Sequence, residues 1–230
     1  MKIRTDFVTN SSSSSYCVSL SVTPTESNKK IVLDLWPDGE DGSGSVNIGM
    51  RVELDEFIGQ VKACSSVDEL KSLLVNLLDF SNDYYELFGE LSVPYSDTNE
   101  EILQTLAAIS EEDDKYIFIS GITKPFNDFK DAFNSFSSLN EIKSITVKEY
   151  FTGWGEFAGE GIEGFLNTAI PEELDLYDEE AVMEALIGKL NEDEIETLIN
   201  GSCSDFSAYI STTIDLSTGE VTKKYSFDGS

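Results

Sequence analysis

The sequence predicts an α+β fold in which several helices pack on a predominantly antiparallel or mixed sheet. Apolar and polar residues alternate near both ends of the chain, as in strands, and apolar residues recur at helical spacing between those ends. Apolar residues make up 40% of the 230 positions, including fourteen Phe and nine Tyr, so the chain can bury a sizeable core. We expect residues 1–15 to form a flexible serine-rich arm and residues 16–230 to form a single domain.

The first third of the chain is expected to be rich in strands. Residues 16–22 alternate apolar and small polar side chains, which is the period of a half-buried strand. Residues 24–28 supply a turn, and the apolar run over 31–36 is typical of a pairing strand. Residues 46–52 are expected to add a third strand.

Two capping boxes predict helices in the middle of the chain. In Ser66-x-x-Glu69 and Thr98-x-x-Glu101, each side chain of the pair can satisfy a free backbone N–H of the first helical turn. Both pairs precede leucine and isoleucine residues at helical spacing. We therefore expect a helix to begin at each box.

A β-α-β unit is expected after these helices. Residues 115–120 and 142–150 have the composition of strands, and between them four phenylalanines fall on one helical face: Phe126, Phe129, Phe133 and Phe136. This stripe is interpreted as core packing rather than as a groove for a partner.

The last third predicts two acidic helices and a hairpin. Asp178 can cap a helix that extends to Leu190, and Asn191-x-x-Glu194 is a further capping box. Residues 206–216 and 220–227 are strand-like and flank a turn in which Gly219 takes the left-handed position.

Charge and composition exclude several classes of function. The chain holds 44 acidic and 15 basic residues and no histidine, for a net charge of −29. Without histidine there can be no Ser-His-Asp or Cys-His nucleophile and no HExxH zinc site. The net charge disfavours direct contact with nucleic acid or with an anionic membrane.

A cytoplasmic location is expected. The three cysteines, Cys17, Cys64 and Cys203, are far apart and include no CxxC pair, which is typical of reduced thiols. The sequence shows no apolar stretch of the length of a signal peptide or of a membrane span.

No cofactor or metal is predicted, although two segments resemble ligand motifs. Residues 159–164 match GxGxxG, but two glutamates within the motif would repel a phosphate, so we interpret the segment as a flexible glycine-rich loop. The acidic loop over 38–42 leaves weak calcium binding open, although it lacks the EF-hand spacing.

Carboxylate chemistry is the enzymatic alternative, because a pair of carboxylates can hydrolyse glycosidic bonds without histidine. Glu156 beside Trp154 is the favoured location, with Tyr150 and Phe151 lining a sugar site. The sequence does not decide whether the protein is an enzyme, but it favours binding.

The N-terminal segment MKIRTDFVTNSSSSSY resembles a segment shared by assorted uncharacterised proteins of low-GC Gram-positive bacteria. The resemblance covers sixteen of the 230 residues. It implies a bacterial origin and carries no activity or catalytic residue. The serine run over 11–15 is interpreted as a leader, with a processed or modified tag as the alternative.

Negative charge is concentrated in the last third. Residues 149–222 hold eighteen acidic residues and one basic residue, Lys189. A protein of this mass exposes roughly 10,000 Å², so its charge spread evenly is about threefold less dense than that of B-DNA. Concentrated on one face, the density approaches that of DNA.

We therefore predict a non-enzymatic binding protein whose acidic helical part, within 149–205, contacts a basic protein. A nucleic-acid mimic that occupies the groove of a nucleic-acid-binding protein is one form of this hypothesis. A soluble acidic protein with no charge-based partner is the remaining alternative. The predicted contact residues are Glu172, Glu173, Asp175, Asp178, Glu179, Glu180, Glu184, Glu192, Asp193, Glu194 and Glu196.

Overall fold

The computed structural model describes residues 14–27, 29–35, 49–79, 98–108, 116–154, 158–171, 174–200 and 205–229. These residues form an α+β fold with a five-stranded antiparallel sheet, which confirms the predicted fold class. The described residues begin inside the predicted arm, because the first strand starts at Ser14.

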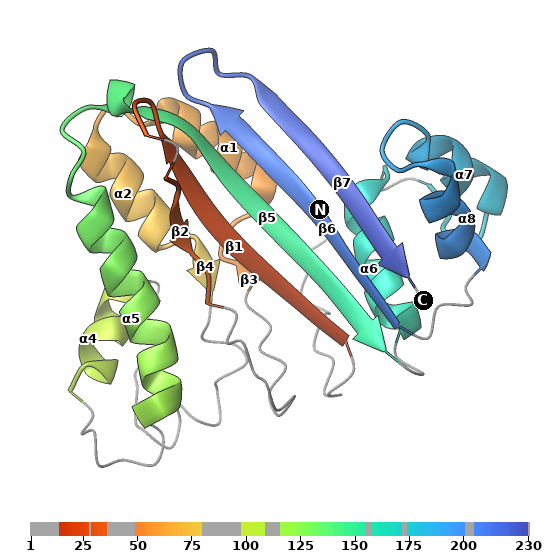
Figure 1. The fold of residues 1–230 in the computed structure, drawn as a ribbon, viewed down its shortest axis with the longest axis horizontal. Coiled ribbons are helices and arrows are strands. Elements are labelled where there is room, and N and C mark those ends of the chain that lie inside the picture. The colour runs from red at the N-terminus through yellow and green to blue at the C-terminus, as the bar shows by residue number, and fades with distance from the viewer. Residues whose placement is uncertain are drawn as a thin grey trace.

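The main sheet has the strand order β2-β1-β5-β6-β7, and every neighbouring pair is antiparallel (Figure 1). The long strand β5 lies at the centre and pairs with β1 on one side and β6 on the other. The strands are β1 (Ser14–Pro24), β2 (Ile31–Leu33), β5 (Ile142–Trp154), β6 (Asp205–Asp215) and β7 (Val221–Gly229). The five strands predicted for these regions are confirmed, with shifted ends.

One face of this sheet is buried because apolar residues occupy every second position. Along β6, alternate side chains from Phe206 to Ile214 are buried. Their neighbours on the same face of β1 and β5 include Val18, Leu20 and Val147, each at most 1% exposed. The alternation of apolar and polar residues along each strand therefore determines which face of the sheet the helices pack on.

The predicted hairpin between β6 and β7 is also confirmed. The Asp215 carboxylate accepts hydrogen bonds from the backbone N–H groups of Ser217 and Thr218, both at 2.9 Å. Gly219 has φ = 70°, in the left-handed region that glycine enters without steric cost.

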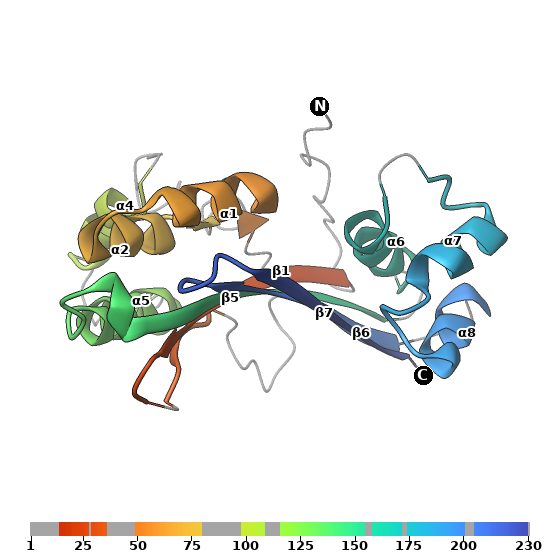
Figure 2. The ribbon, with the colours of Figure 1, turned by 90° about the horizontal axis from the view of Figure 1, so that it is seen from above.

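Four of the described helices gather at one end of the sheet: α1 (Leu54–Ala63), α2 (Val67–Val75), α4 (Asn99–Leu106) and α5 (Tyr116–Phe133). The first three lie over the buried face, and α5 lies beside the edge strand β2 (Figure 2). The two predicted capping boxes mark the starts of α2 and α4. Ser66 Oγ accepts from the backbone N–H of Glu69 at 3.2 Å. Thr98 is the N-cap residue of α4, but its side chain makes no cap hydrogen bond, so the second box predicts the helix start and not the cap itself. The Glu69 carboxylate accepts from the N–H and hydroxyl of Ser65 at 2.8 and 2.9 Å.

Three helices cover the other end of the same face: α6 (Ala158–Ala169), α7 (Glu179–Leu186) and α8 (Glu192–Asn200). Figure 2 shows the two helical groups at opposite ends of the sheet, with β5 running between them. A short 3₁₀ helix (Leu139–Glu141) precedes β5.

The two helical groups bury separate hydrophobic clusters on one sheet. The first cluster includes Phe57, Phe126, Phe129 and Phe133 and rests on the Ile145 end of β5. The second cluster contains the following phenylalanines: Phe151, Phe165, Phe206 and Phe227. Because both clusters pack on β5, the sheet connects them. The predicted core role of the phenylalanine stripe is confirmed for the three members in α5.

The predicted strand over 115–120 is wrong. Tyr116 to Ser120 form the first turns of α5, so the predicted β-α-β unit does not exist and β5 pairs only with antiparallel neighbours. Short apolar runs fit a strand or a buried helix equally well. Here the helical spacing that buries Phe126, Phe129 and Phe133 extends towards the N-terminus.

Two further expectations need correction. The third strand is reduced to β3 (Gly49–Met50), which pairs with β4 (Leu78–Asp79) in a separate two-stranded sheet. Helix α1 was not predicted, although Leu54, Phe57 and Val61 have helical spacing and are buried.

A buried asparagine joins α2, β4 and α4. Asn99 is fully buried, and its side-chain amide donates to the carbonyls of Val75 at 2.8 Å and Leu78 at 2.7 Å. Its side-chain oxygen accepts from Arg51 at 2.7 Å, and its backbone N–H donates to Asn76 at 2.8 Å. These bonds satisfy the whole amide group, which makes its burial tolerable.

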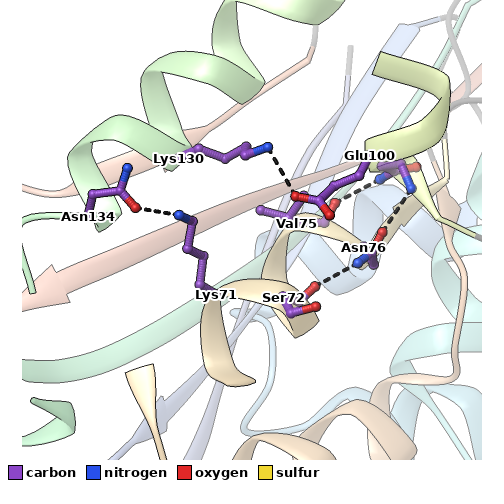
Figure 3. A network of polar contacts seen from close by, with 8 residues as sticks. Lys71, Ser72, Val75, Asn76, Glu100, Lys130 and Asn134 are labelled. Atoms are coloured by element: carbon purple, nitrogen blue, oxygen red, sulfur yellow. Dashed lines mark hydrogen bonds and ion pairs between the residues drawn. The ribbon is translucent and has the colours of Figure 1, made fainter. Parts of the chain in front are cut away.

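The surface around Asn99 carries paired charges and polar groups. Figure 3 shows Lys130 directed at Glu100, with 3.2 Å between Nζ and the carboxylate oxygen, and Lys71 bonded to Asn134. Cations and carboxylates therefore lie close together at this end of the molecule.

Candidate protein-binding surface

Helices α7 and α8 begin at the caps that the sequence predicts. Asp178 Oδ1 accepts from the backbone N–H of Ala181 at 3.1 Å. Asn191 and Glu194 form a reciprocal capping box, with distances of 2.9 and 2.8 Å between side-chain oxygen and backbone nitrogen. The first helix ends at Leu186, not at Leu190 as predicted.

The apolar faces of the two helices fix the direction of their acidic faces. Val182 and Leu186 of α7 and Ile195 and Leu198 of α8 are at most 6% exposed and belong to the second hydrophobic cluster. The remaining helical positions must then face outwards. Residues 174–200, named here the acidic unit, hold nine carboxylates.

Eight of the eleven predicted contact residues are exposed: Asp175, Asp178, Glu179, Glu180, Glu184, Glu192, Asp193 and Glu196. Glu194 is half-buried, and Glu172 and Glu173 lie outside the described residues. The fold therefore gathers nine of the predicted residues in the acidic unit.

Some of these carboxylates have local structural roles. Asp175 accepts from the backbone N–H of Tyr177 at 3.0 Å, and Asp178 caps α7. The Glu194 carboxylate also accepts from the N–H of Phe227 at 3.4 Å, which connects α8 to β7. These three residues would occur at such positions in the absence of any partner.

The helix dipole explains the positions of four more carboxylates. Glu179 and Glu180 lie in the first turn of α7, and Glu192 and Asp193 lie in the first turn of α8, where negative charge is favourable. Glu184 lies beyond the first turn of α7, as Glu196 does in α8, and both are exposed. Substitution of these two residues therefore tests a role in binding without disturbing a helix cap or a first helical turn.

The single basic residue of the acidic unit is directed inwards. Lys189 Nζ donates to the carbonyl of Ala169 at 2.8 Å and lies 5.8 Å from the centroid of the Tyr225 ring. Burial, and secondarily the positive charge of Lys223, lower its pKa. Lys189 is thus half-buried and bonded to the backbone, and the exposed charged side chains of the acidic unit are all carboxylates.

Glu149, which the charge count includes in the acidic stretch, is not a surface residue. It is 1% exposed in the middle of β5, between the two hydrophobic clusters, and accepts from the Tyr16 hydroxyl at 2.9 Å. Tyr225 lies in the same cross-strand row as Glu149, two strands away. Burial, and secondarily the negative charge of Glu149, raise the pKa of Tyr225. Glu149 belongs to the interior.

The GxGxxG match is helical. Residues 159–164 lie within α6, so the predicted flexible loop is wrong and no phosphate-binding turn forms there. A Cβ on Gly161 would lie 2.6 Å from Phe206 Cζ and 2.8 Å from the carbonyl oxygen of Thr152. This glycine allows α6 to approach the sheet closely.

The proposed sugar-lining residues lie on opposite faces of the sheet. Phe151 is buried, with its ring centroid 5.7 Å from that of Phe165. Tyr150 faces the other way, where Lys148 Nζ lies 4.3 Å from its centroid and 3.8 Å from that of Tyr209. Successive residues of a strand alternate in direction, so these two aromatics cannot line one site. Glu156 lies outside the described residues.

Three carboxyl groups among the described residues have a pKa shifted below its ordinary value. They are Glu69, Glu141 and Asp215, and in each the largest cause is a hydrogen bond from a neighbouring serine. A general acid needs a shift in the opposite direction. These three groups therefore offer no support for acid catalysis.

The side chains that the structure describes include neither a candidate metal site nor a candidate reactive thiol. No cluster of three Cys, Asp or Glu ligands occurs there, and the loop over 38–42 lies outside it. Cys64 is a half-buried free thiol whose pKa is raised by burial and by the Glu69 charge. Cys203 and the side chain of Cys17 are not described.

The acidic unit also exposes apolar residues that the sequence analysis did not single out. Tyr177 is 94% exposed, Ile187 is 71% exposed and Met183 is 47% exposed. Sequence alone does not mark them, because α7 contains apolar residues on both of its faces. Only the packing of Val182 and Leu186 shows which apolar residues remain outside.

Among the described helices, none has the length and apolar character that a membrane crossing requires. Comparison of the chain with protein-family models, with curated proteins and with solved structures finds no match.

Proposed function

We propose that the protein is a non-enzymatic binding protein that holds a basic protein against the outward faces of α7 and α8. One observation carries this proposal. Across residues 174–200, eight carboxylates are exposed and one is half-buried, while the only lysine of the segment is bonded to a backbone carbonyl. The exposed charged side chains of this segment are consequently all carboxylates.

Electrostatics supplies the mechanism. Charges of one sign on neighbouring helices add their fields within the Debye length, which is about 8 Å at physiological ionic strength. Such a field accelerates encounters with a basic surface, and the gain falls as salt increases. On the sign of the charge alone, proteins with basic grooves for nucleic acid are one class of suitable partner.

The proposed setting is the cytoplasm of a bacterium. The bacterial origin rests on the resemblance of the N-terminal segment. The cytoplasmic location rests on the spacing of the three cysteines.

A pair of charge-reversed variants tests the proposal. Glu184→Lys/Glu196→Lys alters the acidic unit beyond its helix caps. Asp128→Lys/Asp131→Lys makes the same change of net charge at exposed positions of α5. Each variant and the wild-type protein are used to capture proteins from a nuclease-treated bacterial lysate at low and moderate salt.

We expect the wild-type protein and the α5 variant to retain the same basic protein at moderate salt. The acidic-unit variant is expected to lose at least about tenfold in affinity for it, since close charge pairs at interfaces contribute about 1.4 kcal/mol or more. Equal retention by all three proteins, or only a mixture of basic proteins that moderate salt removes, contradicts the proposal.

A further inference from the structure

Apolar side chains are exposed in the middle of the acidic unit. The described residues include four exposed large apolar side chains, and three of them, Tyr177, Met183 and Ile187, fall within eleven consecutive positions. The fourth, Val32, lies on β2, the edge strand farthest from β7 in the strand order. Single exposed apolar residues are ordinary, but a local cluster marks an interaction surface.

Helix geometry places two of them side by side. Met183 lies in α7 and Ile187 is the C-cap residue of this helix, whose backbone N–H donates to the Met183 carbonyl at 3.2 Å, so their Cβ atoms lie about 5–6 Å apart. Val182 and Leu186 point into the second hydrophobic cluster, and at 100° per residue Met183 and Ile187 lie beside this buried face, where both remain exposed. We name these two exposed residues the apolar ridge.

Carboxylates flank the apolar ridge on both sides. At 100° per residue, Glu179 falls on one side of Met183 and Ile187, and Glu180 and Glu184 fall on the other. All three glutamates are exposed. An apolar centre with a charged rim is the arrangement of protein interfaces.

Tyr177 is a third exposed residue of the acidic unit and precedes the N-cap of α7. Its backbone is held by Asp175, which accepts from its N–H at 3.0 Å, and the next residue, Asp178, caps the helix. Tyr177 precedes this cap, where a side chain can pack against Val182, yet its ring is 94% exposed. Exposed tyrosine on an ordered backbone is typical of the residues that dominate binding energy.

We infer that the apolar ridge docks an amphipathic helix of the partner, with apolar residues at i, i+3 or i+4 and i+7 flanked by lysine and arginine. This inference rests on the proposed function and specifies the chemistry of the partner. The lysines and arginines meet Glu179, Glu180 and Glu184, and the apolar stripe covers Met183 and Ile187. Charge complementarity selects this occupant, because only a basic rim fits the carboxylates beside the ridge.

The same observations disfavour two other occupants. A groove built for nucleic acid presents cationic and polar groups, which would leave Met183 and Ile187 against charge. A second copy of this chain would bring an identical acidic rim against the first one, and like charges oppose that contact.

Two synthetic peptides serve as probes. One is an amphipathic helix of leucine and lysine, and the other has glutamine in place of every leucine, with the same lysines. Their affinities for the full-length protein are measured by fluorescence anisotropy at two salt concentrations. The ridge variant is Met183→Gln/Ile187→Gln, and Val32→Gln is the matched control because it removes an exposed apolar side chain elsewhere.

We expect the wild-type protein to bind the leucine peptide about tenfold more tightly than the glutamine peptide. The ridge variant should lose this preference, and Val32→Gln should keep it. Circular dichroism melting curves should be unchanged, because the substituted residues are exposed. Equal affinity of the wild-type protein for both peptides, or a preference that survives in the ridge variant, overturns the inference.

The charge-reversed variant separates this failure from failure of the proposed function. If Glu184→Lys/Glu196→Lys weakens both peptides equally while the wild-type protein shows no preference, the acidic unit binds but the ridge does not contribute. If the reversed variant binds both peptides as tightly as the wild type, the proposed function fails and the inference fails with it. A concentration-dependent dimer that the ridge variant loses would assign the ridge to a second copy and overturn the inference alone.

Discussion

The two helical groups pack on the same sheet and differ in how they carry charge. Helices α1, α2, α4 and α5 hold eight carboxylates and four lysines. Helices α6, α7 and α8 hold nine carboxylates and no basic residue. At the first end, Lys130 pairs with Glu100 and Arg51 with Asp79, at 3.2 and 3.7 Å.

This difference bears on whether the charge serves solubility alone, which depends mainly on net charge. Local hydrogen bonds, helix caps and helix dipoles account for seven of the nine carboxylates of the acidic unit. The exposed carboxylates and large apolar residues without such a role are Glu184, Glu196, Tyr177, Met183 and Ile187. In the proposed function these residues bind the partner at one end of the molecule, while the other end is structural.

The largest expected effect comes from removing one phenylalanine at either end. Phe129→Ala in the first cluster and Phe165→Ala in the second each leave a cavity and should cost about 3–5 kcal/mol of unfolding free energy. Because β5 belongs to both clusters, each variant should lower the midpoint of one shared urea transition. Circular dichroism and fluorescence then report the same curve.

Separate transitions for the two ends would contradict a single folding unit over residues 16–230. Phe129→Leu and Phe165→Leu remove less volume and give the same comparison if the alanine variants do not fold.

Asn99→Leu tests the polar network at the first end. The substitution leaves the carbonyls of Val75 and Leu78 buried without the amide that now serves them. We expect a loss of about 2–4 kcal/mol in the free energy of unfolding. Asn134→Ala, which removes an exposed amide bonded to Lys71, is the control and should change stability by less than about 0.5 kcal/mol. Equal effects of the two variants would contradict the network.

Gly161→Ala and Gly159→Ala test the packing of α6 and should have opposite signs. The new Cβ at 161 would overlap Phe206 and the Thr152 carbonyl, which should cost about 1–3 kcal/mol. The Cβ at 159 meets nothing within 4 Å, so alanine there should stabilise the helix by about 0.5–1 kcal/mol. Thermal melting of both variants gives the comparison, and equal shifts would show that α6 does not approach the sheet.

Asp215→Asn should have the smallest effect and should depend on pH. Hydrogen bonds from the Ser217 hydroxyl and from the Thr218 and Ser217 N–H groups lower the pKa of Asp215 from 3.8 to about 2. A depressed folded-state pKa stabilises the protein above the unfolded pKa and loses this contribution as pH falls. The wild type should therefore exceed Asp215→Asn in stability at neutral pH, and the gap should close towards pH ~2. A gap that is constant with pH would contradict this origin.

Local signals in the sequence were sufficient for most of the fold. Alternation located β1, β5 and β6, and capping residues located α2, α7 and α8, because these patterns act over a few residues. The strand expected over 115–120 and the loop expected over 159–164 failed for the opposite reason. Helix formation there is decided by the contacts of Phe126 and Phe165, which are distant in sequence from the surfaces they meet.

Only part of the candidate surface could be predicted from the sequence. Composition identified its carboxylates, but it also counted Glu149, whose burial depends on the pairing of β5 with β1 and β6. It gave no indication that Lys189 is directed inwards or that Met183 and Ile187 face solvent. Those properties follow from how α7 packs on the sheet.

Hydrogen exchange of the full-length protein, with and without the basic protein recovered by capture, tests the central claim most directly. We expect protection to appear in α7 and α8 and to weaken as salt increases, while α1, α2 and α5 exchange as before. Protection confined to α1, α2 and α5, or to the outward face of β5 around Lys148 and Tyr150, would contradict the assignment of binding to the acidic unit.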